Sequence, residues 1–588
     1  MQKDSALVGC EEHTIVDFEV SELHIDCSDA EYVPIRQYSG KAVYELHYSG
    51  VRFSLWKDVM SGPIFDAMLN ATRTVPNRGV WVGGKLRPWR ECVEEADRAG
   101  RMLQGAGIGP GHIIATQLAS GWDALVLFAA ASRIGASVMP IHMSLGHHES
   151  AALLKHSMPQ LFVTQRTHRG KDRTNVIGQT VAGAHDLQRI VLEEVDSVAV
   201  ADSQIVRALT CLSNLQREVP ASDLPVPGLL LVSSGTTSHQ PKICIHSEEL
   251  LLRNDRATAE SSGYGADETF LAAGQLSHAF GLLAMHLALV TAGSLGLVPA
   301  WEPELFSESM FASKASVVLA APAHLHDLLN NFNPEADGPL VPPGLKEIRT
   351  GGAPVSSDLS EAVTRATKTK VVVQWGMTEI GVGMFSGTTE ASGHDIRDCG
   401  RPIPGCSARV VSDNGLPVTP GAVGLLQIQT PFVTRGYLGA AGATIRCDAT
   451  SDGWLWTGDL AMESSGTFRI VGRADDRINR GGLKFMASEL ESHLDAMPEL
   501  SYKAVLPVDD ERLGQRAVLV ATTTAEGVDV DLATVTTYLS QKGVARYKHP
   551  EELVLLESMP LTASGKVAKG QLALRLRNNL LLQGKGIS

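Results

Sequence analysis

The chain has 588 residues, of which 44% are hydrophobic and 20% charged, so it is expected to form a globular protein of two or more domains. Its 65 acidic and 51 basic side chains give a net charge of -14, which argues against a general nucleic-acid or membrane-surface binder. The eight cysteines have neither C-x-x-C nor Cys/His ligand spacing, so neither a disulfide framework nor a zinc site is predicted. The first residues are polar and no apolar stretch approaches the length that spans a bilayer, which predicts a cytoplasmic protein without membrane contact.

The first part of the chain predicts an appended segment followed by a layered domain. Residues 1–55 contain short alternating runs, such as 42–48, that are typical of strands, and their role is open. From Gly62 to about Arg169, helical patterns alternate with short apolar strands, which is typical of a layered α/β domain. The expected helices span 90–105 and 121–134, and the expected strands span 113–117, 138–141 and 160–163.

The same alternation resumes at Leu229 and changes after Gly400. Short strands punctuated by glycine then predict a small β-rich subdomain; they span 408–412, 424–430 and 467–471. Residues 475–588 have the size of a separate α+β unit. The expected fold class is therefore α/β, with an extension over 1–55, a large domain of layered α/β sheets and a β-rich subdomain over 56–474, and a small α+β domain over 475–588.

A loop with the composition of a phosphate site follows the apolar strand that ends near residue 232. It contains Gly235, which three hydroxyl side chains follow directly, and it closes on Pro241 and Lys242. Backbone N–H groups, hydroxyls and an ammonium can converge on an anion where no carboxylate repels it. The loop is not a Walker A motif, because no second glycine precedes Lys242 and Ile243 stands where Ser or Thr would bind magnesium. An ordinary Ser/Thr turn is the alternative interpretation.

Two further segments indicate a binding surface. His278 and Phe280 lie beside a glycine at the start of an apolar segment, so they are candidates for a pocket wall, although a core-facing histidine has the same pattern. Gly351 and Gly352 interrupt a strand, which would let a flat ligand approach the backbone closely. A tight βα turn is the alternative at these glycines.

The next segments place aromatic, acidic and basic side chains at strand ends. Trp375 and Glu379 end a buried strand, where open α/β sheets bind ligands, so Trp375 could stack on a base and Glu379 could bind Mg2+. Asp459 is expected at a sharp turn, and with Arg473 it could bind the two hydroxyls of a ribose. Lys566 lies on a Ser-Gly turn. Each feature has a simpler interpretation: Trp375 could be structural and Glu379 solvated. Asp459 and Arg473 could lie in a solvated loop, and Lys566 could be a surface lysine.

These segments, in this order and spacing over about 62–576, resemble the adenylate-forming superfamily of acyl- and aryl-CoA synthetases, nonribosomal peptide synthetase adenylation domains and luciferases. The stretches 477–482, 507–514 and 547–550 are most similar to stand-alone aryl-acid AMP ligases of the 2,3-dihydroxybenzoate type, which serve secondary metabolite biosynthesis. The resemblance implies a cytoplasmic ligase that uses ATP and Mg2+ to turn a small carboxylic acid into its acyl adenylate. A phosphopantetheine thiol, on an acyl or aryl carrier protein or on CoA, would accept the acyl group, and the small C-terminal domain would be mobile.

The same resemblance assigns roles to individual residues. The implied catalytic residues are Lys566, Glu379, Thr236 and Lys242. The implied ATP-binding residues are Ser234, Gly235, Thr236, Thr237, Ser238, Lys242, Gly351, Gly352, Ala353, Pro354, Trp375, Gly376, Met377, Thr378, Asp459, Arg473 and Lys566. The implied acid pocket is formed by His278, Ala279, Phe280, Leu283, Gly352 and Trp375. Glu379 would bind Mg2+, Asp475 would be the hinge, and Gly482 and Lys484 would serve thioester formation.

The chain departs from the family pattern at three places. The phosphate loop is one residue longer, with Ser238 in a glycine's place, and Trp375 replaces a tyrosine. Ala279 stands where enzymes that recognise a 2-hydroxyl carry asparagine, and it cannot donate that hydrogen bond. A less polar aromatic or alicyclic acid is therefore expected in place of salicylate or 2,3-dihydroxybenzoate, with Phe280 and Leu283 lining its site.

Several alternatives remain at this stage. An aromatic or medium-chain acyl-CoA synthetase would use free CoA, and an amide-forming ligase would use an amine. A carrier protein would dock on basic side chains such as Arg546, Lys548, Arg575 and Arg577, for which a scattered surface charge is the simpler interpretation. A non-catalytic nucleotide-binding scaffold is disfavoured, because a scaffold has no need of a lysine that acts only in the chemical step.

Overall fold

A computed structural model describes most of the chain, which separates into two compact units, Met1–Gly62 and Pro63–Ser588. Within the first unit, only the backbone of five strands and Gly62 is described. Within the second unit, the description leaves out 185–189, 194–208, 210–227, 234–241, 332–338, 354, 356, 387–397, 440–442, 481–482, 511, 525–529, 563–565 and 578–588.

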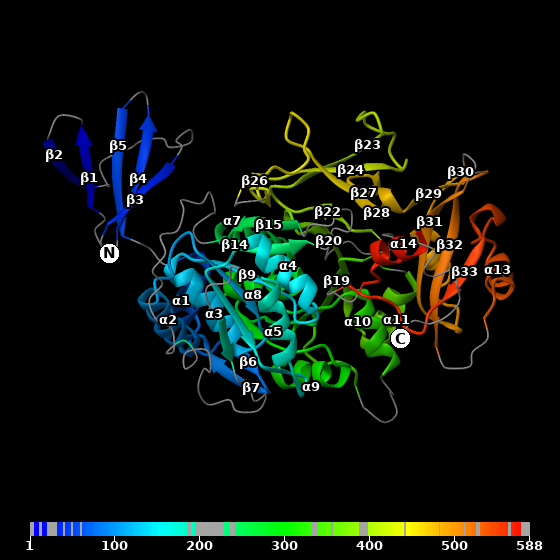
Figure 1. The fold of residues 1–588 in the computed structure, drawn as a ribbon, viewed down its shortest axis with the longest axis horizontal. Helices are drawn as coiled ribbons and strands as arrows, with labels where there is room; N and C mark the ends of the chain where they lie inside the picture. Colours follow the sequence, from blue (N-terminus) through cyan, green and yellow to red (C-terminus); the bar gives the residue numbers. More distant parts are fainter. Residues whose placement is uncertain are drawn as a thin grey trace. The chain divides into compact units, whose positions relative to one another are not determined.

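The first unit is built from antiparallel strands (Figure 1). β1 (Ser5–Cys10) pairs with β2 (Thr14–Glu19). β4 (Lys41–Tyr48) lies between β3 (Tyr32–Tyr38) and β5 (Val51–Asp58). The strand predicted over 42–48 is confirmed as β4.

The second unit contains two large sheets (Figure 1). Parallel strands form the middle of each sheet. The first sheet contains, in spatial order, β13 (Ile190–Glu193), β10 (Leu161–Gln165), β8 (Ile113–Gln117), β9 (Ser137–Pro140), β14 (Gly228–Ser233), β15 (Lys242–Ser247), β25 (Tyr437–Leu438) and β26 (Thr444–Ile445). The second contains β22 (Arg401–Pro402), β21 (Gly381–Phe385), β20 (Lys370–Met377), β19 (Glu347–Gly351), β18 (Val317–Leu319), β16 (Thr269–Ala272), β17 (Ser294–Gly296), β6 (Gly79–Val82) and β7 (Lys85–Pro88).

Helices fill the space between the sheets and cover their outer faces. The inner helices are α1 (Pro63–Thr74), α2 (Trp89–Gly105), α3 (Trp122–Ile134), α7 (Glu248–Ser262) and α8 (Ala279–Thr291), which share one apolar core with side chains of both sheets. α4 (His147–Ser157) and α5 (Thr174–Gly183) pack on the first sheet, and α9 (Pro303–Ser313), α10 (Pro322–Asn330) and α11 (Ser357–Thr367) on the second. Because side chains alternate along a strand, Ile114 and Phe270 enter the central core while their neighbours Ile113 and Leu271 enter the outer cores.

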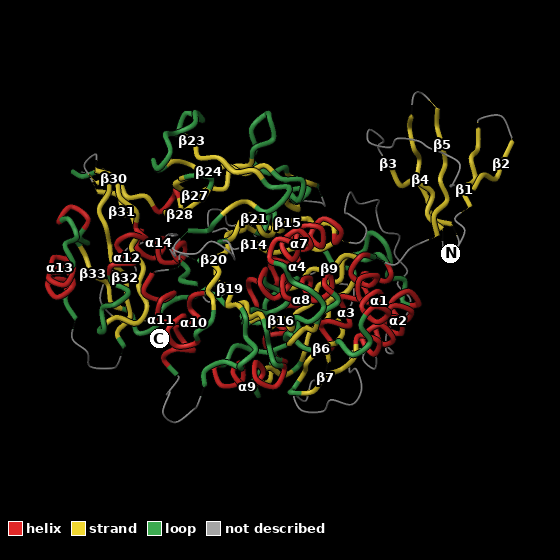
Figure 2. Tube along the Cα trace, turned by 180° about the vertical axis from the view of Figure 1, so that it is seen from behind, coloured by secondary structure: helices red, strands yellow, loops and turns green. Residues whose placement is uncertain are grey.

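Two smaller sheets follow in the chain. β23 (Ser407–Val411), β24 (Gly424–Gln429), β27 (Leu455–Ser464) and β28 (Thr467–Arg473) form an antiparallel sheet, and they lie side by side in Figure 2. The last sheet has the order β30 (Leu483–Met486), β29 (Arg477–Arg480), β32 (Gly514–Thr523) and β31 (Leu500–Asp510), with β33 (Glu552–Leu555) beside β32. The helices α12 (Ala487–His493), α13 (Leu532–Gln541) and α14 (Lys569–Arg577) belong to this last part.

The structure confirms the predicted α/β class, with its β-rich subdomain and C-terminal α+β part. One local prediction is wrong: Asp459 does not lie at a sharp turn but inside β27. Gly458 has a φ of +72° and the register shifts after Leu460, so the glycine marks an irregularity within the strand. The domain boundaries at 55/56 and 474/475 stay predictions. In the part of the chain that the structure describes, no helix is long and apolar enough to cross a membrane.

Candidate active site

Parallel strands of the second sheet bring several predicted segments to one edge. β16, β18 and β19 are neighbours, with Ala272 opposite Leu319 and Leu319 opposite Arg349. His278 follows the carboxyl end of β16, and Gly352 follows that of β19. Ligands of open α/β sheets bind at this edge, because the segments that leave the strands there can converge.

Lys566 reaches this edge from the C-terminal part of the chain. Its own backbone forms a tight turn, in which Thr562 N donates to Lys566 O (2.6 Å) and Lys566 N donates to Thr562 Oγ1 (3.1 Å). A Cβ atom built on Gly352 would lie 3.7 Å from Lys566 Nζ, so the ammonium lies directly against the turn that follows β19. Gly352 has a φ of +75°, which side chains other than glycine rarely adopt.

Asp459 connects the lysine to the β-rich subdomain. Trp375 Nε1 donates to Asp459 Oδ2 (2.9 Å), and Arg473 Nη1 donates to Asp459 Oδ1 (3.1 Å). Burial raises the pKa of Asp459, and the positive charges of Arg473 and Lys566 oppose this shift. Burial lowers the pKa of Lys566, while Asp459 raises it. The structure therefore brings together four predicted site residues from four separate segments.

Trp375 belongs to the core as well as to the site. Its side chain is 7% exposed and packs with the apolar cluster below the β-rich sheet. A Cβ atom on Gly383 would lie 2.5 Å from the indole ring, so glycine at that position makes room for the ring. The stacking of Trp375 on adenine stays a prediction. Next to Gly351, the hydroxyl of Thr350 is buried and has no partner among the described residues, which suits a polar ligand at this turn.

Glu379 is held by a tyrosine that no sequence motif indicated. Tyr437 donates from its hydroxyl to Glu379 Oε1 (2.8 Å), and the second carboxylate oxygen has no partner within the described ranges. Lys242 Nζ lies 5.3 Å from the centre of the Tyr437 ring. Burial and then the charge of Glu379 raise the pKa of Tyr437 far above its usual range, so the phenol stays a donor. A carboxylate oxygen available for an ion fits Mg2+, which favours carboxylates together with substrate phosphates.

The predicted phosphate loop falls largely outside the described residues. Its strands are described: Ser233 of β14 lies opposite Lys242, so residues 234–241 connect two adjacent antiparallel strands and Lys242 begins β15. The predicted ATP contacts that lie outside the described residues are Ser234, Gly235, Thr236, Thr237, Ser238 and Pro354. The other predicted ATP contacts, Ala353, Gly376, Met377 and Thr378, follow β19 or lie at the end of β20.

The predicted acid pocket lies at the beginning of α8. His278 caps this helix, because its Nδ1 accepts a hydrogen bond from Phe280 N (3.4 Å). Phe280 and Leu283 are buried in the central core, whereas Ala279 is exposed. Burial lowers the pKa of His278 to about 3, and the charges of Lys566, His142 and His324 lower it further. His142 and His324 are thus near the site, although no motif in the sequence distinguishes them.

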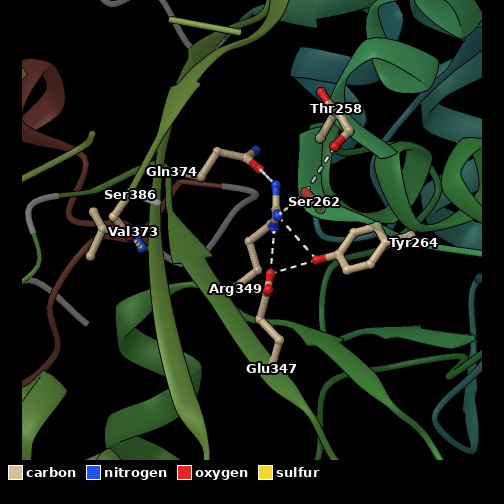
Figure 3. Close-up of polar contacts among 8 residues, drawn as sticks. All are labelled: Thr258, Ser262, Tyr264, Glu347, Arg349, Val373, Gln374 and Ser386. Carbon is tan, nitrogen blue, oxygen red and sulfur yellow. Dashed lines mark hydrogen bonds and ion pairs between the residues drawn. The ribbon is translucent and has the colours of Figure 1, made fainter. Parts of the chain in front are cut away.

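A buried arginine holds the strands beneath this edge (Figure 3). Arg349 of β19 is 0% exposed and donates to Glu347 Oε1 (2.9 Å), and it donates to Gln374 Oε1 of β20 (3.0 Å). It also donates to Ser262 Oγ (2.7 Å) and to the hydroxyl of Tyr264 (3.0 Å) at the end of α7. These contacts fix β19 and β20 relative to α7, two residues before the Gly351 turn.

Comparison with known proteins identifies the family. A family model described as "AMP-binding enzyme" matches residues 71–438, which is more than half of the chain. The chain belongs to the AMP-binding enzyme family. A second model, "AMP-binding enzyme C-terminal domain", matches residues 489–566 and so ends at Lys566.

Relatives of this AMP-binding enzyme include aryl-acid ligases. A salicylyl-CoA synthase / salicylate adenylyltransferase from a Streptomyces species is 30% identical over 504 residues, covering 82% of this chain and 88% of that protein. A salicyl-AMP ligase / salicyl-S-ArCP synthetase from Mycobacterium tuberculosis is 28% identical over 525 residues, covering 87% of this chain and 90% of that protein. The crystal structure of ATP-bound MatB from Rhodopseudomonas palustris shares the fold, with a TM-score of 0.72 at 23% identity over 88% of this chain and 99% of that chain.

The comparisons confirm the predicted adenylate-forming ligase, which uses ATP and acts on a small carboxylic acid. The use of Mg2+ stays a prediction. In this AMP-binding enzyme, the predicted hinge Asp475 lies in the 3-10 turn Ala474–Asp476 between β28 and β29. Gly482 lies outside the described residues, as do the side chains of Asp475 and Lys484. Lys569 Nζ pairs with Asp476 Oδ2 (3.0 Å) and Glu491 Oε1 (2.9 Å), which fixes the start of α14 to this turn.

The basic residues considered for carrier docking differ in their surroundings. Lys548 forms an ion pair with Glu489, so part of its charge is satisfied within the chain. Arg575 is exposed on α14, next to the half-exposed Leu574. The structure therefore leaves a carrier contact at these residues as a prediction.

Proposed function

We propose that this enzyme activates an aryl acid, or an apolar acid of similar size, as its acyl adenylate and then transfers it to the phosphopantetheine thiol of a carrier protein. The observation that carries the proposal is the position of Lys566 Nζ against Gly352, within electrostatic reach of Asp459, Arg473 and His278. This arrangement would place one mobile positive charge between the nucleotide turn and the acid pocket.

In the first half-reaction, an oxygen of the acid attacks the α-phosphorus of ATP. A new P–O bond forms, the bond from the α-phosphorus to the bridging oxygen breaks, and pyrophosphate leaves with that oxygen. Little covalent chemistry is asked of the protein, so catalysis rests on positioning and charge stabilisation. Lys566 would stabilise the negative charge on the carboxylate and the α-phosphate, a role suited to a compact cation on a flexible stem.

The remaining residues would bind the nucleotide. Asp459 would accept the ribose hydroxyls while Arg473 holds its carboxylate. Gly351 and Gly352 would lie against adenine. The loop that ends at Lys242 would hold the phosphates through Lys242 and through Ser234, Gly235, Thr236, Thr237 and Ser238. Mg2+ bound at Glu379 would neutralise phosphate charge.

In the second half-reaction, the thiol attacks the acyl carbon and AMP leaves. We propose that the C-terminal part turns about Asp475, which withdraws Lys566 and brings Gly482 and Lys484 to the site. The short turn at Ala474–Asp476 supports this idea, because a few residues at the end of an element can absorb such a rotation.

Two measurements test the proposal. Acid-dependent exchange of labelled pyrophosphate into ATP, over a panel of benzoates, picolinates, alicyclic and straight-chain acids, tests adenylation. Supplying free CoA, a phosphopantetheinylated aryl carrier protein or an amine then tests the acceptor. We expect thioester on the carrier at a kcat/KM well above that with CoA. If none of the acids supports exchange, the adenylation proposal is refuted. If the enzyme uses CoA efficiently and does not use the carrier protein, the carrier assignment is refuted.

A further inference from the structure

Three histidines follow carboxyl ends of strands near the proposed acid pocket. His142 lies two residues after β9, His278 lies between β16 and α8, and His324 lies in the first turn of α10, which follows β18. In each ring, Nδ1 accepts a hydrogen bond from a backbone N–H close by. The donors are Ser144 N (3.2 Å), Phe280 N (3.4 Å) and Ala321 N (3.2 Å), respectively.

These backbone contacts indicate the tautomer, because a backbone N–H can only donate. At His142, Ser144 Oγ also lies 2.8 Å from Nδ1, and its hydroxyl can donate to the same nitrogen. A nitrogen that accepts a hydrogen bond carries no proton, so in each neutral ring the proton is on Nε2. The rings are neutral because burial lowers the pKa of His142 to about 4, of His278 to about 3 and of His324 to about 4. Within the residues that the structure describes, none of the three Nε2 atoms has a hydrogen-bond partner.

The three rings belong to one neighbourhood. Leu276 N, two residues before His278, donates to Ser120 Oγ (2.7 Å), and this contact joins the end of β16 to the end of β8, the neighbour of β9. A positive charge on Lys566, His142 or His324 lowers the pKa of His278, which indicates that these side chains lie near its ring. The ring of His324 is further held by Trp301, at 4.3 Å between ring centres.

The arrangement is suited to a ligand atom other than a metal. In the described part of the chain, no group of three or more His, Cys, Asp or Glu side chains could hold a metal ion. Three imidazoles whose Nδ1 atoms are already occupied offer N–H donors and no acceptor. An acid that displaces water from these N–H groups must supply an acceptor in return, because a donor that becomes buried without a partner is costly.

We propose that the acid activated by this enzyme carries, on its ring, a hydrogen-bond acceptor without a proton, such as a carbonyl, an ether oxygen or a ring nitrogen. The Nε2–H groups of His142 and His324 recognise this acceptor, while His278 lies beside the carboxylate end near Lys566. The inference rests on the proposed function, because it uses the same acid pocket. It narrows the expectation drawn from Ala279: the acid lacks a 2-hydroxyl recognised at that position but is not purely apolar.

The test compares pairs of acids that differ in the acceptor and little in shape. The pairs are 4-acetyl- and 4-isopropylbenzoate, 3-methoxy- and 3-ethylbenzoate, and nicotinate and benzoate, each measured by pyrophosphate exchange. For at least one pair, the wild-type enzyme is expected to favour the acceptor-bearing acid by about tenfold or more in kcat/KM, since a site built from donors discriminates against an analogue that lacks the acceptor.

Substitutions then assign the donors. His324→Phe and His142→Phe remove an N–H and are expected to bring the ratio within each pair close to one. His324→Gln restores an N–H near the position of Nε2 and is expected to recover part of the preference. His112→Phe is the matched control, because His112 Nδ1 also accepts from a backbone N–H (Gly109 N, 2.8 Å) but lies at the amino end of β8. This variant is expected to keep the wild-type ratio.

The outcomes separate the two proposals. Robust exchange with equal use of both members of every pair by the wild-type enzyme would overturn the acceptor inference and leave the proposed function standing. A preference that survives in both phenylalanine variants would also overturn it. If none of the tested acids supports pyrophosphate exchange, both the proposed function and the inference are overturned.

Discussion

Replacement of Lys566 by methionine tests the geometry most directly. The change removes the ammonium that lies against Gly352 while keeping an unbranched side chain of similar length. Two unit charges about 4 Å apart interact by about 4 kcal/mol at an effective dielectric constant of 20. Since the charge that develops in the transition state is a fraction of a unit, we expect a loss of about 3 kcal/mol, which is roughly 10²-fold in rate.

The assay follows each half-reaction separately. Pyrophosphate exchange reports adenylation and should fall by that factor in Lys566→Met. Thioester formation from supplied acyl adenylate should stay within about threefold of wild type, because the proposed rotation removes Lys566 from the site before the thiol attacks. Lys542→Met is the surface control, since Lys542 is exposed at the end of α13. Exchange within tenfold of wild type, or an equal loss in both half-reactions, would refute the reasoning.

Three further predictions concern the supports of the site. Tyr437→Phe removes the donor to Glu379 Oε1, worth about 1 kcal/mol, so the Mg2+ concentration for half-maximal exchange should rise about fivefold; an unchanged titration would argue against Glu379 as the ligand. Arg349→Met leaves Glu347 buried without its ion pair, so the free energy of unfolding, measured in urea, should fall by about 3 to 5 kcal/mol. A loss under about 1 kcal/mol would contradict this prediction. The pKa of His278 is about 3 in the folded enzyme, below its unfolded value, so the unfolded state takes up the proton first. Stability should therefore be level above about pH 7 and fall from about pH 6.5 downwards, and calorimetry should show a shallower fall in His278→Phe.

Much of the layered fold follows from patterns that are local in the sequence. The helices predicted over 90–105 and 121–134 correspond to α2 and α3, whose bounds differ from the prediction by one residue. The strand predicted over 113–117 is β8. These elements were predictable because burial on one face of a helix, or on both faces of a central strand, leaves a periodic trace that needs no knowledge of distant residues.

The errors and omissions at the site have the opposite cause. Asp459 was expected at a turn because Gly458 is a turn signal, but a glycine with positive φ also occurs where a strand is irregular, and only the pairing of β27 with its neighbours separates the two. Tyr437 was missed because it contacts Glu379 across 58 residues from a strand of two residues, too short to leave a periodic pattern. Both cases depend on long-range pairing, which a motif does not record.

The three imidazoles show how much of specificity lies beyond motifs. The chain has 19 histidines, and nothing in the residues around His142 or His324 separates them from the others. What distinguishes them is a conjunction: each follows a carboxyl end of a strand, and each has its Nδ1 occupied by a neighbouring N–H, so that Nε2 becomes the donor. The strands fix where the side chains meet, while the short segments after them decide which hydrogen-bonding groups are offered. Under the proposed function, substitution in those segments is therefore expected to change the acid without disturbing the layers, whereas substitution of Lys566 or Asp459 is expected to impair activation of every acid.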